Sequence, residues 1–309
     1  MIRVPDQKDF DLLYNYYMKK TVSEKTFVLL EQIEFFSIIN PAFIAVDQEN
    51  HVINGFILSH FKDEKSYITM LYAESFEIKQ KLIQFYDLSM INQKIKESWI
   101  HFFNPVSLAW YPNENIVHPC YQGVPFEGED YDLYLKNGYH SNSIQDTYFL
   151  NLNDFEMKIE VMEQIKNNLL EGIEIALYDP NKHKKILEFT DDIQVPHWKA
   201  VILENLNLFN PLPLLVALKK NRVIGFTGPL KVEDNGRGFF AGIGVLDNER
   251  GKKIGKTLFF SLCQTLKAMG SSYMTLYTGR DNPAKYIYLS AGFKVVKSFS
   301  TMKKRYELL

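Results

Sequence analysis

A short sequence similarity between the two halves of this chain limits its possible folds more than any other feature. The segment Tyr134–Tyr139 (YLKNGY) and the segment Tyr288–Phe293 (YLSAGF) place aromatic residues around a helix-like spacer and a glycine in the same order, 154 positions apart (288 minus 134). A chain of 309 residues is long enough for two domains. The repeat therefore predicts a duplicated domain. We expect domains over residues 1–152 and 153–309, with a linking helix over 153–170.

Hydrophobic periodicity and turn residues predict an α/β domain in the second half. The strongest helix begins at Ile254, because apolar residues follow at intervals of four as far as Leu266. We expect strands over 173–178, 214–219, 223–232, 238–245, 273–278, 293–297 and 302–308, and helices over 181–190, 197–207, 254–270 and 284–291. In the first half, a similar run of three strands is expected over 42–47, 52–61 and 67–72.

Composition excludes several classes of function. The chain has 35 Lys and Arg against 37 Asp and Glu, a net charge of -2 that disfavours a nucleic-acid-binding domain. No apolar run approaches the ~18 residues of a membrane span, and the amino terminus does not have the apolar segment of a secretory signal. The two cysteines, Cys120 and Cys263, fall in different predicted domains and match no metal-binding spacing. We therefore expect a cytoplasmic protein with no metal, no membrane partner and no nucleic-acid partner.

The segment Arg250–Lys256 (RGKKIGK) runs directly into the strongest helix and predicts an anion site. Backbone N–H groups converge at a helix N-terminus, and glycines allow a phosphate to approach them closely. The segment nearly matches the nucleotide-binding pattern G-x-x-x-x-G-K-[ST]. It departs from that pattern because only three residues separate Gly251 from Gly255. A nucleotide-dependent phosphotransferase stays open as an alternative.

The same segment resembles the acyl-coenzyme A loop of the GCN5-related N-acetyltransferases (GNAT), whose pattern is [QR]-x-x-G-x-[GA]. Arg250 and Gly255 match, whereas Lys253 replaces the middle glycine. A second family signature, N-x-x-A-x-x-x-Y-x-x-x-G-F, resembles the stretch from Asn282 to Phe293 after one position of slack. The similarity covers about residues 170–309, and the duplication resembles the tandem members of this superfamily. It implies two GNAT-like domains, each with a mixed, mostly antiparallel central sheet flanked by helices.

The resemblance also implies roles for individual residues. The N–H of Val245 would stabilise the oxyanion, and the Tyr288 hydroxyl would protonate the departing thiolate. No general base is named; we interpret His197 as a packing or capping residue, and Glu233 and Asp234 as solvated turn residues. The residues expected to bind acetyl-coenzyme A (acetyl-CoA) are Ile243, Gly244, Val245, Arg250, Gly251, Lys252, Lys253, Ile254, Gly255, Lys256 and Asn282.

The first half does not have the anion-binding loop. After its third strand, the sequence Ala73–Ile78 has no glycine and carries Glu74 and Glu77, so we interpret this half as a degenerate copy. The chain is expected to bind one coenzyme A. The predicted function is transfer of an acetyl group from coenzyme A to a primary amine, most simply of a small molecule. An acyl-CoA sensor without turnover is the other alternative.

Overall fold

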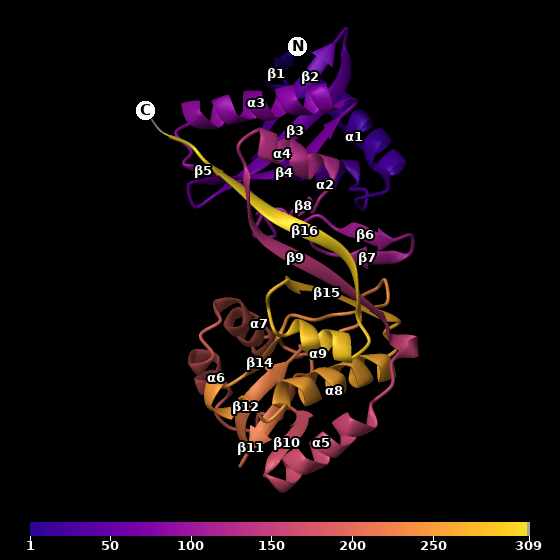
Figure 1. The fold of residues 1–309 in the computed structure, drawn as a ribbon, viewed down its shortest axis with the longest axis vertical. Coiled ribbons are helices and arrows are strands. Elements are labelled where there is room, and N and C mark those ends of the chain that lie inside the picture. Colours follow the sequence, from indigo (N-terminus) through magenta and orange to yellow (C-terminus); the bar gives the residue numbers. More distant parts are fainter. Residues whose placement is uncertain (308–309) are drawn as a thin grey trace. The chain divides into compact units, whose positions relative to one another are not determined.

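The computed structural model describes residues 1–307, which divide into two compact units (Figure 1). The first unit contains residues 1–147 together with residues from 296 onward, and the second contains residues 148–295. The single domain boundary expected near residue 152 placed residues from 296 onward in the second domain, whereas in the structure they belong to the first unit. The last strand belongs with the first unit because it hydrogen-bonds to a strand of that unit at Glu97–Ile100.

The first unit is built on a sheet with the strand order β1-β2-β3-β4-β5-β16-β9. The pairs β1–β2, β2–β3 and β3–β4 are antiparallel, and so is β5–β16. The pair β4–β5 is parallel. The strands are β1 (Ile2–Arg3), β2 (Phe43–Glu49), β3 (Val52–Lys62), β4 (Lys65–Ala73), β5 (Glu97–Ile100), β6 (Trp110–Asn113), β7 (Ile116–His118), β8 (Val124–Pro125), β9 (His140–Asn151) and β16 (Lys294–Arg305). The helices are η1 (Gln7–Asp9), α1 (Phe10–Glu24), α2 (Gln32–Ile39), α3 (Phe76–Asn92) and α4 (Glu129–Lys136).

The second unit has an antiparallel sheet with the order β10-β11-β12-β14, and β15 pairs separately with β13 and with β9. The strands are β10 (Ile173–Leu177), β11 (Leu215–Lys219), β12 (Arg222–Thr227), β13 (Arg237–Gly238), β14 (Ile243–Val245) and β15 (Tyr273–Gly279). The helices are η2 (Leu152–Asp154), α5 (Ile159–Leu170), α6 (Ile186–Asp192), α7 (Pro196–Leu206), η3 (Asp247–Glu249), α8 (Ile254–Ala268) and α9 (Lys285–Ser290). Helix α8 packs on β11, β12 and β14.

Several predicted elements differ from the structure. The two strands expected at 293–297 and 302–308 are one continuous strand, β16. The strand expected over 238–245 is interrupted between β13 and β14. The linking helix expected from residue 153 begins at Ile159, after the turn of 3-10 helix η2.

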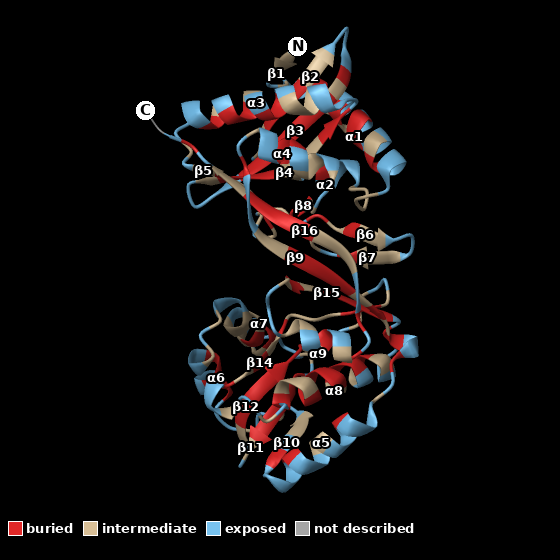
Figure 2. Cartoon of the chain, in the orientation of Figure 1, coloured by how far each residue is buried: buried red, intermediate tan, exposed pale blue. Residues whose placement is uncertain are grey.

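Each unit has its own apolar interior (Figure 2). In the second unit, α8 supplies a completely buried row that includes Leu258, Leu262 and Leu266. Cys263 is also completely buried. The alternation of buried and exposed positions on α8 is why its period was legible in the sequence. Among residues 1–307, no helix is long and apolar enough to cross a bilayer.

A buried carboxylate fastens the returning strand into the first unit. Asp87 on α3 accepts hydrogen bonds from the hydroxyls of Tyr139 (2.9 Å) and Tyr306 (2.7 Å), and from the ammonium of Lys304 (2.7 Å). Tyr139 is far in the sequence from Lys304 and Tyr306. Removing the carboxylate would leave the Tyr139 hydroxyl unpaired and Lys304 without its counter-ion, although Lys304 keeps the carbonyl of Asn137 and Tyr306 keeps Ser98. This loss is more costly than the absence of one ordinary hydrogen bond.

We therefore expect Asp87→Ala to lower the free energy of unfolding by about 3–5 kcal/mol. Tyr139→Phe removes a single donor and should lower it by about 1 kcal/mol. Urea denaturation of the full-length protein, followed by far-ultraviolet circular dichroism, measures both. Equal effects of the two substitutions would contradict a central role for the carboxylate.

Candidate functional site

One side of β14 has no strand partner in the part of the chain that the structure describes. Val245 of β14 lies opposite Gly225 of β12, and the next residue, Leu246, donates its N–H to the carbonyl of Ile224 (2.9 Å). Antiparallel pairs alternate between hydrogen-bonded and non-hydrogen-bonded positions. The N–H and C=O groups of Val245, and of Ile243 two residues earlier, therefore point away from β12. They face a free strand edge.

The edge is free because regular strand structure is interrupted between β13 and β14. The strand β13 pairs with β15 in parallel at Arg237 and Gly238, but β14 does not continue this pairing. Trp198 of α7 occupies the break: its indole N–H donates to the carbonyl of Ala241 (3.2 Å). A Cβ on Gly242 would lie 2.0 Å from the indole nitrogen, and Gly242 has a φ of +148°. Only glycine fits this position, so the tryptophan and the glycine together keep the two strands apart.

A cleft of about 510 Å³ lies along this edge and ends at the N-terminus of α8. The residues expected to bind acetyl-CoA line it, except Lys252 and Asn282. Lys252 instead pairs with Glu249, and the Asn282 side chain accepts from the N–H of Ala284 (2.9 Å). The lining consists of Ile193, Val195, Trp198, Ile243, Gly244, Val245, Glu249, Arg250, Gly251, Lys253, Ile254, Gly255, Lys256, Ala284 and Ile287.

The N-terminus of α8 is uncapped and cationic. Its N-cap residue, Lys253, makes no side-chain capping hydrogen bond, and the N–H groups of the first helical turn have no partner within the helix. Arg250, Lys253 and Lys256 surround it, with Arg250 also paired to exposed Asp247 (2.8 Å). The resulting positive potential adds to that of the helix dipole. The arrangement suits a multiply charged anion.

Lys253 has a left-handed backbone conformation, with a φ of +58°. This is the position where the family pattern has its middle glycine. A non-glycine residue in this conformation costs roughly 1–2 kcal/mol. The departure from the pattern therefore preserves the local backbone shape, and the added side chain brings a positive charge to the helix start.

Two carboxylates near the site form ion pairs with basic side chains. Hydrogen bonding from Lys252 is the main reason that the pKa of Glu249 lies below its ordinary value, and Lys219 also donates to it (2.9 Å). Glu233, which we expected to be a solvated turn residue, forms a bidentate pair with the guanidinium of buried Arg237 (2.7 and 2.8 Å). That expectation was wrong. The buried guanidinium of Arg237 needs a negative charge beside it, and Glu233, four positions earlier, supplies it.

Tyr288 lies in the core of the second unit. It is 5% exposed and packs against the rings of Phe259 (4.9 Å between centroids) and Tyr148 (5.8 Å). Burial, and then the nearby Tyr148, raise the pKa of its hydroxyl. It is not among the residues that line the cleft, whereas Ala284 and Ile287 of the same segment are. His197 is exposed at the start of α7.

Sequence reasoning did not find the wall formed by Ile193, Val195 and Trp198. These residues precede or begin α7, more than forty positions before β14 in the sequence. The available signal was Pro196 at a helix start followed closely by a tryptophan. That signal fixes a helix boundary but does not indicate which strand the tryptophan contacts.

The first unit has a corresponding arrangement that is closed. Gly55 lies opposite Ala73 at the end of β4, as Gly225 lies opposite Val245 at the end of β14. The following helix, α3, is capped by its own serine: Ser75 accepts from the N–H of Ile78 (3.3 Å). Its flanking carboxylates, Glu74 and Glu77, pair with lysines. This helix start thus has fewer open donors and more negative charge than that of α8.

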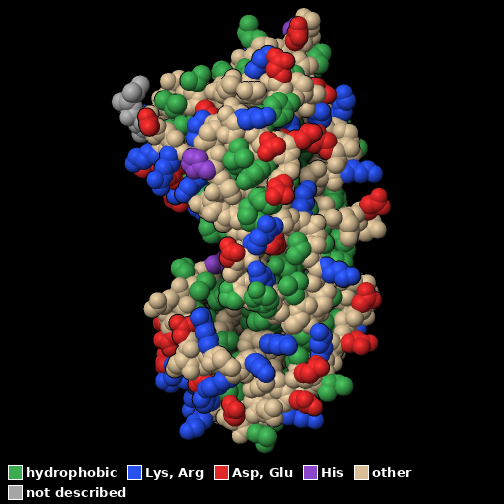
Figure 3. Space-filling model, viewed as in Figure 1, with side chains coloured by type: hydrophobic (Ala, Val, Ile, Leu, Met, Phe, Trp, Pro, Cys, Tyr) green, Lys and Arg blue, Asp and Glu red, His purple; other side chains and the backbone are tan. Residues whose placement is uncertain are grey.

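Charges elsewhere are mixed. On the face of the molecule in Figure 3, basic and acidic side chains are interspersed over each unit, unlike the basic stripe of a nucleic-acid-binding protein. Within residues 1–307, no group of three or more His, Cys, Asp or Glu side chains is placed to hold a metal ion.

Comparison with known proteins identifies the second unit. The sequence model of the Acetyltransferase (GNAT) family matches residues 183–293. No curated protein matches the chain. Many solved structures do, at low identity, so that each likeness concerns the fold.

Three of these structures cover nearly the whole chain. A GCN5-related glucosamine N-acetyltransferase region of a fungal multi-domain GH3 beta-N-acetylglucosaminidase has a TM-score of 0.67 at 16% identity, and covers 98% of this chain and 38% of that one. A GCN5-related N-acetyltransferase from Sphaerobacter thermophilus has a TM-score of 0.63 at 10% identity, covering 99% and 95%. A tandem GNAT protein from the clavulanic acid biosynthesis pathway has a TM-score of 0.57 at 9% identity, covering 99% and 98%. Residues 183–293, within the second unit, therefore form an acetyltransferase domain of the GNAT family, and the chain as a whole has the fold of the tandem GNAT proteins.

Proposed function

We propose that the second unit binds acetyl-CoA in the cleft beside β14 and transfers the acetyl group to a primary amine of a small molecule. The observation that carries the proposal is the free edge of β14 leading to the uncapped, cationic N-terminus of α8. Acetyl-CoA has a peptide-like pantetheine arm and a pyrophosphate, so it needs a strand edge and an anion site in this order. Both are on one wall of one cleft.

In this proposal, each part of the cleft has a distinct task. The outward N–H and C=O groups of Ile243 and Val245 hydrogen-bond to the pantetheine arm, and Val245 N–H stabilises the oxyanion that forms when the amine attacks the thioester carbonyl. The N–H groups at the start of α8, with Arg250 and Lys256, hold the pyrophosphate. The new carbon–nitrogen bond replaces the carbon–sulfur bond. The attacking amine loses a proton to water, the departing thiolate takes one from the Tyr288 hydroxyl, and water restores the hydroxyl.

The cleft also has features that suit binding without turnover. The hydroxyl of Tyr288 is buried among aromatic rings, and the cleft-lining residues include Glu249 as their one carboxylate, which is engaged by two lysines. A protein that senses acyl-CoA would need the strand edge and the anion site but no proton-transfer groups. We keep this as the second candidate function.

Release of free thiol from acetyl-CoA, measured against a panel of polyamines, aminoglycosides and amino acids, separates the two functions. We expect release with at least one amine, and expect Tyr288→Phe to lower its rate at least tenfold while leaving acetyl-CoA affinity nearly unchanged, because an acid acts in the transition state. The substituted phenylalanine ring keeps the aromatic packing. An unchanged rate would remove the hydroxyl from catalysis, and binding with no release for any amine would favour the sensor.

Gly255→Ala tests the anion site. A Cβ there would lie 3.6 Å from Ile287 Cδ1 and 3.9 Å from Val245 Cγ2, which are ordinary contacts, so the free protein should be as stable as the parent or up to about 1 kcal/mol more stable. The same methyl group would keep a phosphate from the backbone. Loss of a charge-assisted hydrogen bond, about 1.5–3 kcal/mol, should weaken coenzyme A binding by roughly 10- to 150-fold.

The matched control is Gln264→Ala, an exposed position on the same helix. It alters helix propensity without reaching the cleft, so its coenzyme A affinity should equal that of the parent. Calorimetric titration gives the affinities, and urea denaturation gives the stabilities. If Gly255→Ala binds coenzyme A as tightly as Gln264→Ala, the pyrophosphate does not lie at the start of α8.

A further inference from the structure

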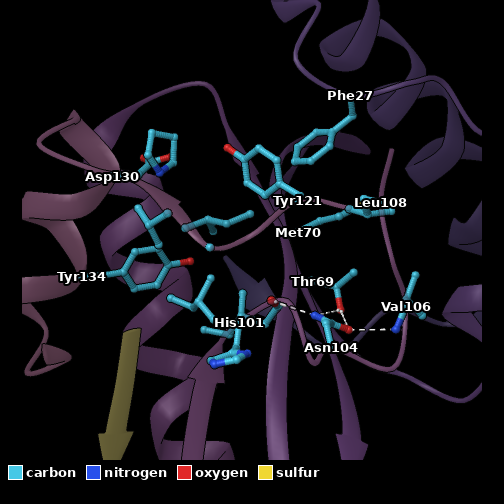
Figure 4. Close-up of a pocket in the computed structure, with 16 residues that line it drawn as sticks. Phe27, Thr69, Met70, His101, Asn104, Val106, Leu108, Tyr121, Asp130 and Tyr134 are labelled. Carbon is cyan, nitrogen blue, oxygen red and sulfur yellow. Dashed lines mark hydrogen bonds between the residues drawn. The ribbon is translucent and has the colours of Figure 1, made fainter. Parts of the chain in front are cut away.

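The first unit contains a small cavity of about 90 Å³ where β4 and β5 separate (Figure 4). The two strands pair in parallel only as far as Tyr67 and Trp99. Beyond this point, the Asn104 side chain donates to the carbonyl of Ile68 (3.2 Å) and so occupies the first stretch of the free edge of β4. The cavity begins beside it. Its size admits a ligand of only a few non-hydrogen atoms, at roughly 30 Å³ for a water-sized group.

Two tyrosine hydroxyls in the cavity wall have no hydrogen-bond partner among residues 1–307. Tyr134 of α4 is 4% exposed, and Figure 4 shows its hydroxyl pointing into the cavity. Tyr121 lies across the cavity, with its hydroxyl directed toward the side where Asp130 lies. Neither hydroxyl is sealed in the core, and Tyr121 is only half-buried, so both are open to the cavity. Two open hydroxyls in the same cavity offer hydrogen bonds to a polar group that the chain itself does not supply.

Carboxylates are the charged groups that act on these two hydroxyls. Burial, followed by the charge of Asp130, raises the pKa of both tyrosines, and the charge of Glu24 contributes at Tyr121. Lys79 engages Asp130 through Oδ1 (2.6 Å), which leaves Oδ2 without a partner in the described part of the chain. Burial lowers the pKa of His101, at the other end of the cavity, to about 4, so this histidine is neutral. A cation is therefore favoured over an anion.

The rest of the wall is apolar. Phe27, Met70, Val106 and Leu108 line the cavity on the side away from Asp130. A ligand that satisfies both parts has a cationic hydrogen-bond donor at one end and a short apolar body at the other. An ammonium group has three donors, and both hydroxyl and carboxylate oxygens accept such hydrogen bonds.

We propose that this cavity binds a small primary alkylammonium ion, with its charged group at Tyr121, Tyr134 and Asp130 and its alkyl chain against Met70 and Leu108. The site lies wholly within the first unit. It is separate from the acetyl-CoA cleft and does not depend on what that cleft binds. The first unit, whose helix start at α3 does not suit an anion, would thus have a ligand site of opposite charge preference.

Saturation-transfer NMR at millimolar ligand tests the proposal with n-propylamine, n-propanol and propionate, which have similar size and different charge. We expect n-propylamine to bind at least tenfold more tightly than n-propanol, and propionate to give no saturable signal. Equal binding of amine and alcohol, or tighter binding of propionate, would overturn the charge preference. No binding of any of the three would overturn the site itself.

Variants locate the binding. Asp130→Asn should weaken n-propylamine binding at least tenfold and Tyr134→Phe several-fold, whereas the control Asp132→Asn, exposed on the same helix, should match the parent. Lys79→Gln removes the partner of Asp130 Oδ1, so both carboxylate oxygens become free. This variant should bind n-propylamine several-fold more tightly, a gain that misfolding could not produce. If Asp130→Asn behaves as Asp132→Asn does, or Lys79→Gln weakens binding, the amine does not bind at this carboxylate.

Discussion

The separation of β14 from β15 is the constraint on which the second unit depends. Two parallel neighbours in a sheet would normally satisfy each other's N–H and C=O groups. Here Trp198 takes the carbonyl of Ala241 and fills the space beside Gly242, so pairing stops after β13. The unpaired groups of Ile243 and Val245 then line a cleft instead of a sheet interior. Because α8 begins a few residues later, the free edge leads directly to open helix donors.

The two units show how small local changes close such a cleft. The topology around β3, β4 and α3 repeats that around β12, β14 and α8. In the first unit, however, Ser75 caps the helix and Asn104 hydrogen-bonds to the edge of β4. Glu74 and Glu77 flank this helix start, where α8 has cations. The first unit therefore shares the local topology but does not present the groups that suit a phosphate.

Patterns that are local in sequence predicted the local parts of the structure. The start of α8, its buried face and the glycine positions of the loop follow from a helical period and from backbone freedom within twenty residues. The break at residues 239–242 could not be predicted, because it depends on Trp198 from another helix. The same applies to β16, whose partners lie some two hundred residues earlier in β5, and to Glu233, whose partner Arg237 is buried only by the tertiary fold.

We propose that an uncapped helix start beside a free strand edge is what binds acyl-CoA, and we therefore expect the second unit alone to bind it. Calorimetric titration of the intact protein with coenzyme A tests this most directly, because it counts sites without assuming an acceptor. We expect one site per chain, lost on charge reversal of both Arg250 and Lys256. Two sites per chain, or one site that survives the double reversal, would contradict it.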